Sequence, residues 1–290
     1  MANPILRDKL QRKEFIFAPG IQDMITAVIA NKVGFDIVYG SGYWVTASAY
    51  GLPDAGIATY TQMVDRMATL VRSSKAAVVA DADTGYGGLL NVHHTVRGYE
   101  AAGLSGIQLE DQEFPKKCGH TPHRRVIPCG DMVDKIKVAV DARQDENLVV
   151  IARTDALDSE GFNAAIDRAN AYREAGADVL FVEAMKNAEQ MRSACAQVGG
   201  PMMANMSNGG ATEQLNQRQM MELGFSMAIA PSLTSLAAAF AAELALRSLK
   251  AQGSAEPAGV DLFAFKEFCS LIGFEDVWEF EKKWSQESSV

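Results

Sequence analysis

AAVVADAD, residues 76–83, is apolar along most of its length and ends in two carboxylates. Similar short runs recur along the chain, separated by longer segments with the period of an α-helix. The others are residues 15–20, 36–42, 106–112, 148–156, 178–184, 201–207 and 225–232. Strands that are apolar on both faces indicate a parallel sheet covered by helices. About eight such strands are what an α/β barrel requires, so we predict a (β/α)8 TIM-type barrel.

The length of 290 residues fits either one barrel of roughly 250 residues or two smaller domains. The repeated pattern extends to about residue 250, so we assign residues 1–250 to one α/β barrel catalytic domain. Its last apolar run, residues 236–246, is too short to cross a bilayer and predicts a buried helix. Residues 251–290 predict a linker and one or two C-terminal helices rich in aromatic side chains. Such an apolar face needs a partner surface, either the barrel itself or another subunit.

The charge balance excludes two classes of partner. Lys and Arg number 27 against 36 Asp and Glu, a formal net charge of −9. This is the wrong sign for binding nucleic acid or an anionic membrane. The four cysteines lie far apart without a CxxC pair, and no apolar signal segment follows the polar N-terminus. We therefore expect a reducing, cytoplasmic environment.

Polar side chains end most of the predicted strands, and in an α/β barrel these ends converge on one site. Six of the ten strand-end residues are carboxylates, whose burial is costly without a partner. Hard oxygen ligands without His or Cys favour Mg²⁺ or Mn²⁺ over zinc. For a single carboxylate, helix capping or an ion pair with Arg153 is the better interpretation, but not for the whole set. The strand-end residues are Ser41, Gly42, Asp81, Asp83, Glu110, Asp111, Arg153, Asp155, Glu183 and Asn205.

A long polar loop follows the run at residues 106–112, and loops of this length in barrels are commonly functional. In it, Cys118 follows two lysines and lies near His120. An electropositive setting lowers the pKa of a thiol and suits it to proton transfer. A surface thiol in a basic turn explains the spacing equally well, and both interpretations stay open at this point.

Taken together, seven motifs resemble the isocitrate lyase and phosphoenolpyruvate mutase superfamily, most closely its branch of 2-methylisocitrate lyase and 2,3-dimethylmalate lyase. The resemblance covers almost the whole chain. KKCGH is its most specific part, because the lyases of this family use that cysteine as the catalytic acid or base. The motifs are YGSG at 39–42, LPD at 52–54, DADTGYG at 81–87, EDQ at 110–112, KKCGH at 116–120, ARTDA at 152–156 and ANM at 204–206.

The resemblance implies a barrel whose last helix is exchanged between subunits, usually within a homotetramer, which would explain the aromatic tail. It also implies a Mg²⁺ ion bound directly by Asp81, with Asp83, Glu110 and Asp54 reaching it through water; Mn²⁺ is the alternative ion.

The implied substrate is a 2-hydroxy or 2-oxo carboxylate, held by backbone amides of Ser41, Gly42 and Tyr43. Further substrate contacts are expected from Trp44, Gly119, His120 and Asn205.

The implied reaction is a retro-aldol cleavage of the C2–C3 bond, giving a 2-oxo acid such as pyruvate and an enediolate of a second acid. Cys118 would protonate the enediolate carbon, Lys116 belongs to the same motif, and Arg153 would stabilise the developing negative charge. Tyr39, Arg153 and Glu183 are candidates for taking the hydroxyl proton, and the sequence does not rank them.

Two departures from the methylisocitrate branch concern the substrate. That branch has a carboxylate after ANM, where this chain reads Ser207-Asn208-Gly209-Gly210. It also has an arginine after the proline that ends the last strand, where this chain offers only Leu236 and its neighbours. An arginine there would bind an additional carboxylate, so its absence favours a dicarboxylate such as 2,3-dimethylmalate. Trp44, where the family usually has a small residue, suits a pocket for methyl groups or packs in the core.

Several alternatives to this lyase remain. Within the superfamily they are 2-methylisocitrate lyase, oxaloacetate hydrolase and carboxyphosphonoenolpyruvate phosphonomutase. A non-catalytic, metabolite-binding barrel is disfavoured by the intact set of charged residues. A Schiff-base aldolase is disfavoured because no lysine ends a predicted strand.

Overall fold

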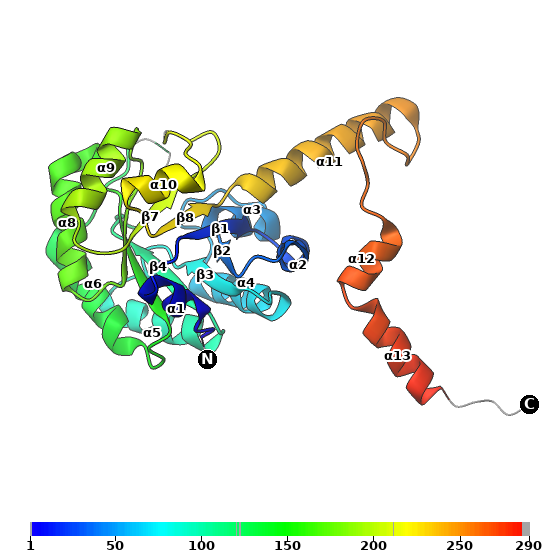
Figure 1. Cartoon of the computed structure of the whole chain (residues 1–290), viewed down its shortest axis with the longest axis horizontal. Helices are drawn as coiled ribbons and strands as arrows, with labels where there is room; N and C mark the ends of the chain where they lie inside the picture. Colours follow the sequence, from blue (N-terminus) through cyan, green and yellow to red (C-terminus); the bar gives the residue numbers. More distant parts are fainter. Residues whose placement is uncertain (1, 120, 122, 211, 286–290) are drawn as a thin grey trace, which may run out of the picture.

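The computed structural model describes residues 2–119, 121, 123–210 and 212–285. Eight parallel strands form a closed barrel in chain order, which confirms the predicted TIM-type architecture (Figure 1). The strands from the second to the eighth are each shorter than the apolar run that predicted them, because the last polar residues of each run lie in the following loop or helix, whereas the first strand has the same length as its run. The strands are β1 (Ile16–Ile21), β2 (Ile37–Gly40), β3 (Ala77–Asp81), β4 (Gly106–Glu110), β5 (Val149–Thr154), β6 (Val179–Val182), β7 (Met202–Asn205) and β8 (Met227–Ala230).

The barrel has two buried apolar layers. Side chains that point inward, such as Val79 and Ile151, pack with Leu6 from α1 (Ile5–Gln11) in the interior of the barrel. Side chains that point outward, such as Val78 and Val150, pack under the surrounding helices. Because side chains alternate along a strand, both faces of each strand are apolar, as the sequence runs required.

Helices cover the outside of the barrel and place the loops at its carboxyl-terminal mouth (Figure 1). Several begin with a side-chain cap, as Asp23 and Thr59 do by accepting hydrogen bonds from backbone amides. Gly34 and Gly224 end two of them at positive φ, where glycine is favoured. These helices are α2 (Met24–Val33), α3 (Gly42–Tyr50), α4 (Tyr60–Ser73), α5 (Leu89–Ala101), α6 (Cys129–Ala142), α7 (Ala156–Glu160), α8 (Phe162–Glu174), α9 (Ala188–Gln197) and α10 (Gln217–Leu223).

The helix after β8 corrects one prediction. Residues 236–246 are helical, within α11 (Leu233–Gln252), but the helix runs away from the barrel instead of being buried (Figure 1). Phe240 and Leu246 are each 65% exposed. The prediction of a buried helix is wrong for the single chain, because the apolar residues of α11 find no surface to pack on within it.

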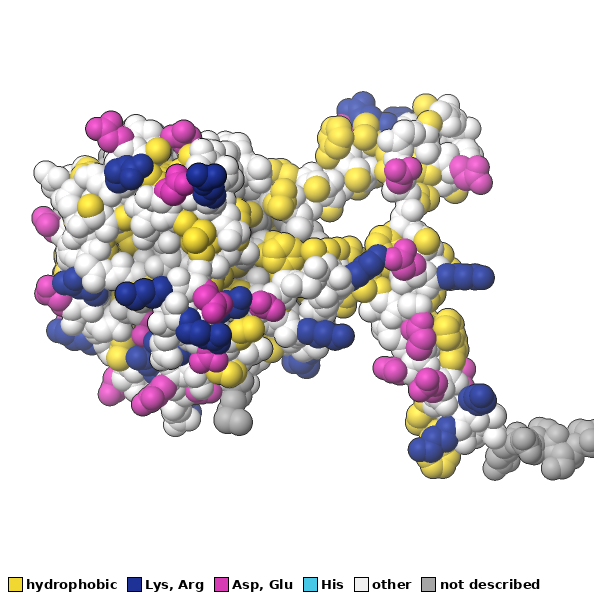
Figure 2. Space-filling model, in the orientation of Figure 1, with side chains coloured by type: hydrophobic (Ala, Val, Ile, Leu, Met, Phe, Trp, Pro, Cys, Tyr) yellow, Lys and Arg dark blue, Asp and Glu magenta, His cyan; other side chains and the backbone are white. Residues whose placement is uncertain are grey.

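The C-terminal arm is residues 251–290, and its described part contains α12 (Phe265–Leu271) and α13 (Phe274–Trp284), where the sequence predicted one or two helices. It returns toward the outside of α2, where Lys32 pairs with Glu267 and lies 4.8 Å from the centroid of the Phe263 ring. Figure 2 shows hydrophobic side chains along α11 and along the arm. The arm therefore leaves much of its apolar surface uncovered in the single chain.

Across the part of the chain that the structure describes, no helix combines the length and apolarity needed to cross a membrane.

Candidate active site

The structure brings the predicted site residues together at the carboxyl ends of the strands, around a cavity of about 220 Å³. Two predicted residues do not line the cavity but lie directly behind residues that do: Gly42 lies beside Asp81, and Asp83 lies beside Lys116. His120 lies outside the described residues. The predicted residues that line the cavity are Tyr39, Ser41, Tyr43, Trp44, Asp54, Asp81, Glu110, Lys116, Cys118, Gly119, Arg153, Glu183 and Asn205.

Asp81 ends β3 and is held by its neighbours. Its Oδ1 accepts a hydrogen bond from the Asp83 amide at 3.0 Å and lies 3.5 Å from the Gln108 Nε2 donor. Its Oδ2 faces Gly42, where a Cβ would lie only 2.8 Å away. Only glycine at position 42 therefore lets the start of α3 approach this carboxylate.

An acidic cluster surrounds the buried ammonium of Lys116. Lys116 pairs with Asp54, and its Nζ lies 2.8 Å from Asp83 Oδ1. Burial raises the pKa of Asp81 and Glu110 above their usual values and that of Asp83 to about 6. Burial alone would lower the pKa of Lys116, but the surrounding carboxylates raise it well above its usual value. The site thus holds more buried carboxylates than its cations neutralise.

A divalent cation suits this donor set. Glu110 Oε1 is buried and has no hydrogen-bond partner among the residues that the structure describes, and every acidic donor here is a hard oxygen. Among the described residues, no group of three His, Cys, Asp or Glu side chains is already arranged as a metal site. The residues therefore fit Mg²⁺ by charge and donor type, while Lys116 contacts two of the carboxylates directly.

Arg153, at the end of β5, is shared by three carboxylates. Its Nε and Nη2 donate to Asp155 at 2.8 and 2.9 Å. It also lies 3.5 Å from Glu110 Oε2 and 3.3 Å from Glu183 Oε2. Burial opposes its charge, but Asp155, Glu110 and Glu183 raise its pKa well above the usual value. Arg153 is a fixed cation at the cavity wall.

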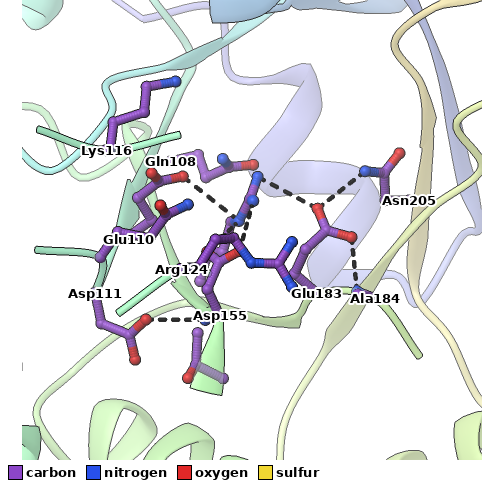
Figure 3. Close-up of polar contacts among 12 residues, drawn as sticks. Gln108, Glu110, Asp111, Lys116, Arg124, Asp155, Glu183, Ala184 and Asn205 are labelled. Atoms are coloured by element: carbon purple, nitrogen blue, oxygen red, sulfur yellow. Dashed lines mark hydrogen bonds and ion pairs between the residues drawn. The ribbon is translucent and has the colours of Figure 1, made fainter. Parts of the chain in front are cut away.

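Glu183 follows β6 and is oriented by two donors (Figure 3). Its Oε1 accepts a hydrogen bond from the Ala184 amide at 2.7 Å, and its Oε2 accepts one from Asn205 Nδ2 at 3.0 Å. Ala184 adopts a φ of 63°, which is uncommon for a residue with a side chain. These contacts keep the carboxylate at the cavity, beside Arg153.

The first turn of α3 faces the cavity with backbone amides. Val45 donates to the Ser41 carbonyl, so the amides of residues 42–44 have no partner within the helix. Amides of this kind suit a carboxylate. Tyr43 and Trp44, whose ring centroids lie 4.7 Å apart, place aromatic surface beside them.

The segment carrying Cys118 is anchored from both sides. The Cys118 amide donates to the Asp54 carbonyl at 3.2 Å, and Gln112 exchanges two hydrogen bonds with the backbone of Lys117. Gly119 packs directly on Arg153, since a Cβ there would lie 2.1 Å from Nη2. The thiol and the guanidinium thus share one cavity.

Tyr39 lies deeper in the barrel and donates to Gln108 Oε1 at 3.0 Å. Burial and the nearby Asp81 raise the pKa of its hydroxyl well above 10. Tyr39 therefore stays protonated at neutral pH and acts as a donor.

The sequence reasoning missed several residues of the site. Gln108 lies inside an apolar strand, where nothing but its polarity marks it. Ile229 in β8 and Ser232 after it also line the cavity, and no charge marks either of them in the sequence. The other cavity residues after β7 and β8 were interpreted from the sequence only as departures from the methylisocitrate branch; they are Ser207, Asn208, Gly209, Gly210, Pro231 and Leu236.

Comparison with known proteins identifies the family. The sequence pattern of the family described as phosphoenolpyruvate phosphomutase matches residues 6–250. The chain is 39% identical over 280 residues to 2,3-dimethylmalate lyase of Eubacterium barkeri, covering 97% of each chain. It is 38% identical over 272 residues to 2-methylisocitrate lyase of Aeropyrum pernix, covering 94% of this chain and 87% of the relative. The chain belongs to the phosphoenolpyruvate mutase/isocitrate lyase superfamily.

Solved structures of this superfamily have the same fold. A crystal structure of 2,3-dimethylmalate lyase superposes with a TM-score of 0.91 at 32% identity, covering 99% of this chain and 97% of that chain. Oxaloacetate acetylhydrolase with 3,3-difluorooxalacetate also gives 0.91, at 31% identity with 98% and 97% covered. Phosphonopyruvate hydrolase with oxalate and Mg²⁺ gives 0.88, at 28% identity with 99% and 100% covered. This chain is thus an enzyme of the isocitrate lyase/phosphoenolpyruvate mutase kind.

Proposed function

We propose that this enzyme is a Mg²⁺-dependent carbon–carbon lyase that cleaves a 2-hydroxy dicarboxylate of the 2,3-dimethylmalate type into pyruvate, or another 2-oxo acid, and a carboxylic acid. The observation that carries this choice is the cavity wall formed after β7 and β8. Its described residues include Asn208, Ser232, Pro231 and Leu236 but no Lys or Arg. A third substrate carboxylate would find no cation there, whereas methyl groups would meet Leu236 and Trp44.

The ion would be held by Asp81, with Asp83, Glu110 and Asp54 around it, and Mn²⁺ is the alternative. When bound, it supplies Lewis-acid stabilisation of negative charge on the substrate oxygens. The solved relative with oxalate and Mg²⁺ supports this choice of ion.

Substrate binding is assigned to the first turn of α3 and to the wall around it. The amides of Gly42 and Tyr43 hold a carboxylate, with Ser41 at the helix start. Trp44, Gly119, His120 and Asn205 complete the contacts.

The chemical step is divided among four side chains. Glu183 takes the proton of the 2-hydroxyl, because Tyr39 stays protonated and Arg153 is a fixed cation. The C2–C3 bond breaks, C2 becomes the carbonyl of the 2-oxo acid, and the bonding electrons pass to C3 and its carboxylate as an enediolate. Arg153 stabilises the negative charge as it forms. Cys118 then donates its proton to C3, and Lys116 keeps the acidic cluster neutral enough to accept an anionic substrate.

Pyruvate release in the presence of Mg²⁺ tests this function, comparing 2,3-dimethylmalate with 2-methylisocitrate and including an EDTA control. We expect faster, EDTA-sensitive cleavage of dimethylmalate. Faster cleavage of methylisocitrate would show that another cation binds the third carboxylate. Oxalate with acetate from oxaloacetate would favour the hydrolase, and a phosphinate product the phosphonomutase.

We also propose that the enzyme is a cytoplasmic homotetramer in which α11 and the arm, residues 251–290, pack on a neighbouring subunit. The exposed apolar residues of α11 and α13 support the exchange. Four free cysteines suit a reducing compartment.

A further inference from the structure

Arg124 is a buried cation in the loop that carries Cys118. It is only 8% exposed, although the loop is polar. Its Nη2 donates to Asp158. Its Nε lies 3.7 Å from Asp155 Oδ1, and Figure 3 labels both of these residues. Arg124 does not line the cavity, so its place in the chemistry must run through other residues.

The burial of Arg124 is incompletely compensated. Within the described part of the chain, neither Nε nor Nη1 has a hydrogen-bond acceptor. Unsatisfied buried donors destabilise a fold. Arrangements that break such a local rule are expected at functional sites. Of the two carboxylates near Arg124, Asp155 is the one that is fully buried, so a functional reason for burying Arg124 is to be sought in its contact with Asp155.

Asp155 connects Arg124 to the cavity. Its two carboxylate oxygens accept the paired hydrogen bonds of Arg153, and its amide donates to Asp111 Oδ1 at 2.9 Å. Glu110 and Glu183 also face the Arg153 guanidinium. The orientation of Arg153 and the charge that it presents to the cavity thus depend on how strongly Asp155 binds it.

We propose that Arg124 is a positioning residue, which fixes the Asp155 carboxylate and offsets part of its charge, so that Arg153 stays oriented and less of its positive charge is cancelled by Asp155 at the substrate. The inference rests on the proposed function, in which Arg153 stabilises the developing charge. The loop that supplies Arg124 also supplies Cys118 and Gly119, so one segment places both the acid and the cation of the reaction.

The first test compares Arg124→Gln with Arg124→Lys and with the matched control Arg125→Gln. The Arg125 side chain is 81% exposed and pairs with Glu113 at the surface. With 2,3-dimethylmalate and Mg²⁺, we expect Arg124→Gln to lower kcat by about 10- to 100-fold with little change in KM. Arg124→Lys should recover part of the loss, and Arg125→Gln should match the wild type. Equal losses at positions 124 and 125 would overturn the inference.

A double-mutant cycle separates positioning from simple anchoring of the loop. If Arg124 acts through Asp155, Arg124→Gln in an Asp155→Asn background should cause little further loss. Asp158, the half-exposed ion-pair partner of Arg124, is tested by Asp158→Asn. We expect this variant to lower kcat by less than about threefold, because exposed ion pairs contribute little. Additive losses at 124 and 155, or a loss in Asp158→Asn as large as in Arg124→Gln, would overturn the proposal.

Oxalate binding gives a readout that does not need turnover. By calorimetry with Mg²⁺, we expect Arg124→Gln to weaken oxalate binding about tenfold and Arg125→Gln to leave it unchanged. Wild-type protein that binds oxalate but does not cleave dimethylmalate would refute the proposed substrate, and the binding comparison alone would then decide the role of Arg124. Unchanged oxalate affinity in Arg124→Gln, or wild-type protein that neither binds nor cleaves, would overturn the inference.

Discussion

The mouth of the barrel and the C-terminal arm have opposite characters. At the mouth, charged side chains are buried beside groups of opposite charge, as Arg153 is beside Asp155, Glu110 and Glu183. On α13, in the part of the chain described here, no residue is buried, and Trp278 and Phe280 are 52% and 65% exposed. The difference teaches that the buried ion pairs of the site form within one chain, whereas the apolar side chains of the arm stay exposed in it. Substitutions in the two regions should therefore affect different measurements.

The largest effect is expected from Cys118→Ser. A hydroxyl is a much weaker acid than a thiol, so protonation of the enediolate should slow and kcat should fall by about 10²- to 10⁴-fold. Cys129→Ser is the matched control, because Cys129 begins α6 outside the cavity. Steady-state pyruvate release measures both. Full activity in Cys118→Ser would mean that another group is the acid.

The second-largest fall in kcat is expected from Gly119→Ala. The added Cβ would lie 2.1 Å from Arg153 Nη2, so either the guanidinium or the loop must move. A displacement of about 1 Å at a catalytic group can reduce kcat by about 10²-fold. Gly130→Ala is the control, because a Cβ there meets no atom within 4 Å and alanine favours the helix. Similar kcat values in the two variants would show that Arg153 is not held by this contact.

Substitutions in the arm should change subunit association instead of kcat. Trp278→Ala with Phe280→Ala removes apolar surface that we expect a neighbouring subunit to cover. A combined loss of about 2 kcal/mol would weaken subunit association roughly 30-fold. Lys282→Ala with Lys283→Ala is the control on the same helix. Sedimentation over a dilution series measures the association, and an unchanged assembly in the aromatic variant would place these residues outside the interface.

The same contrast explains which features the sequence could predict. The barrel was predictable because burial on both faces makes each strand apolar, and because strand ends converge by geometry. Thus the positions of Asp81, Glu110 and Arg153 follow from the sequence once the strands are recognised. The roles of individual residues in the site, however, remain proposals.

Other features depend on contacts that local patterns do not encode. The helix α11 has the composition of a buried helix, yet most of its apolar side chains are exposed in the single chain. Strand register places Gln108 beside Tyr39 and Asp81, and the loop path places Asn208 at the cavity, and neither residue carries a charge that would mark it. Arg124 was visible as one basic residue of a basic loop, but its burial beside Asp155 depends on the fold.

The smallest expected effect concerns specificity at the border between the two regions. Trp44 from α3 and Leu236 from α11 line the same cavity, so the apolar wall joins the barrel to the helix that leaves it. Trp44→Ala removes aromatic surface that would contact a methyl group, and losses of this kind change kcat/KM by about tenfold. We expect kcat/KM for 2,3-dimethylmalate to fall while that for the larger 2-methylisocitrate falls less or rises. An equal fall for both substrates would mean that Trp44 supports the cavity without selecting the substrate, because a selective contact must change the ratio of the two values.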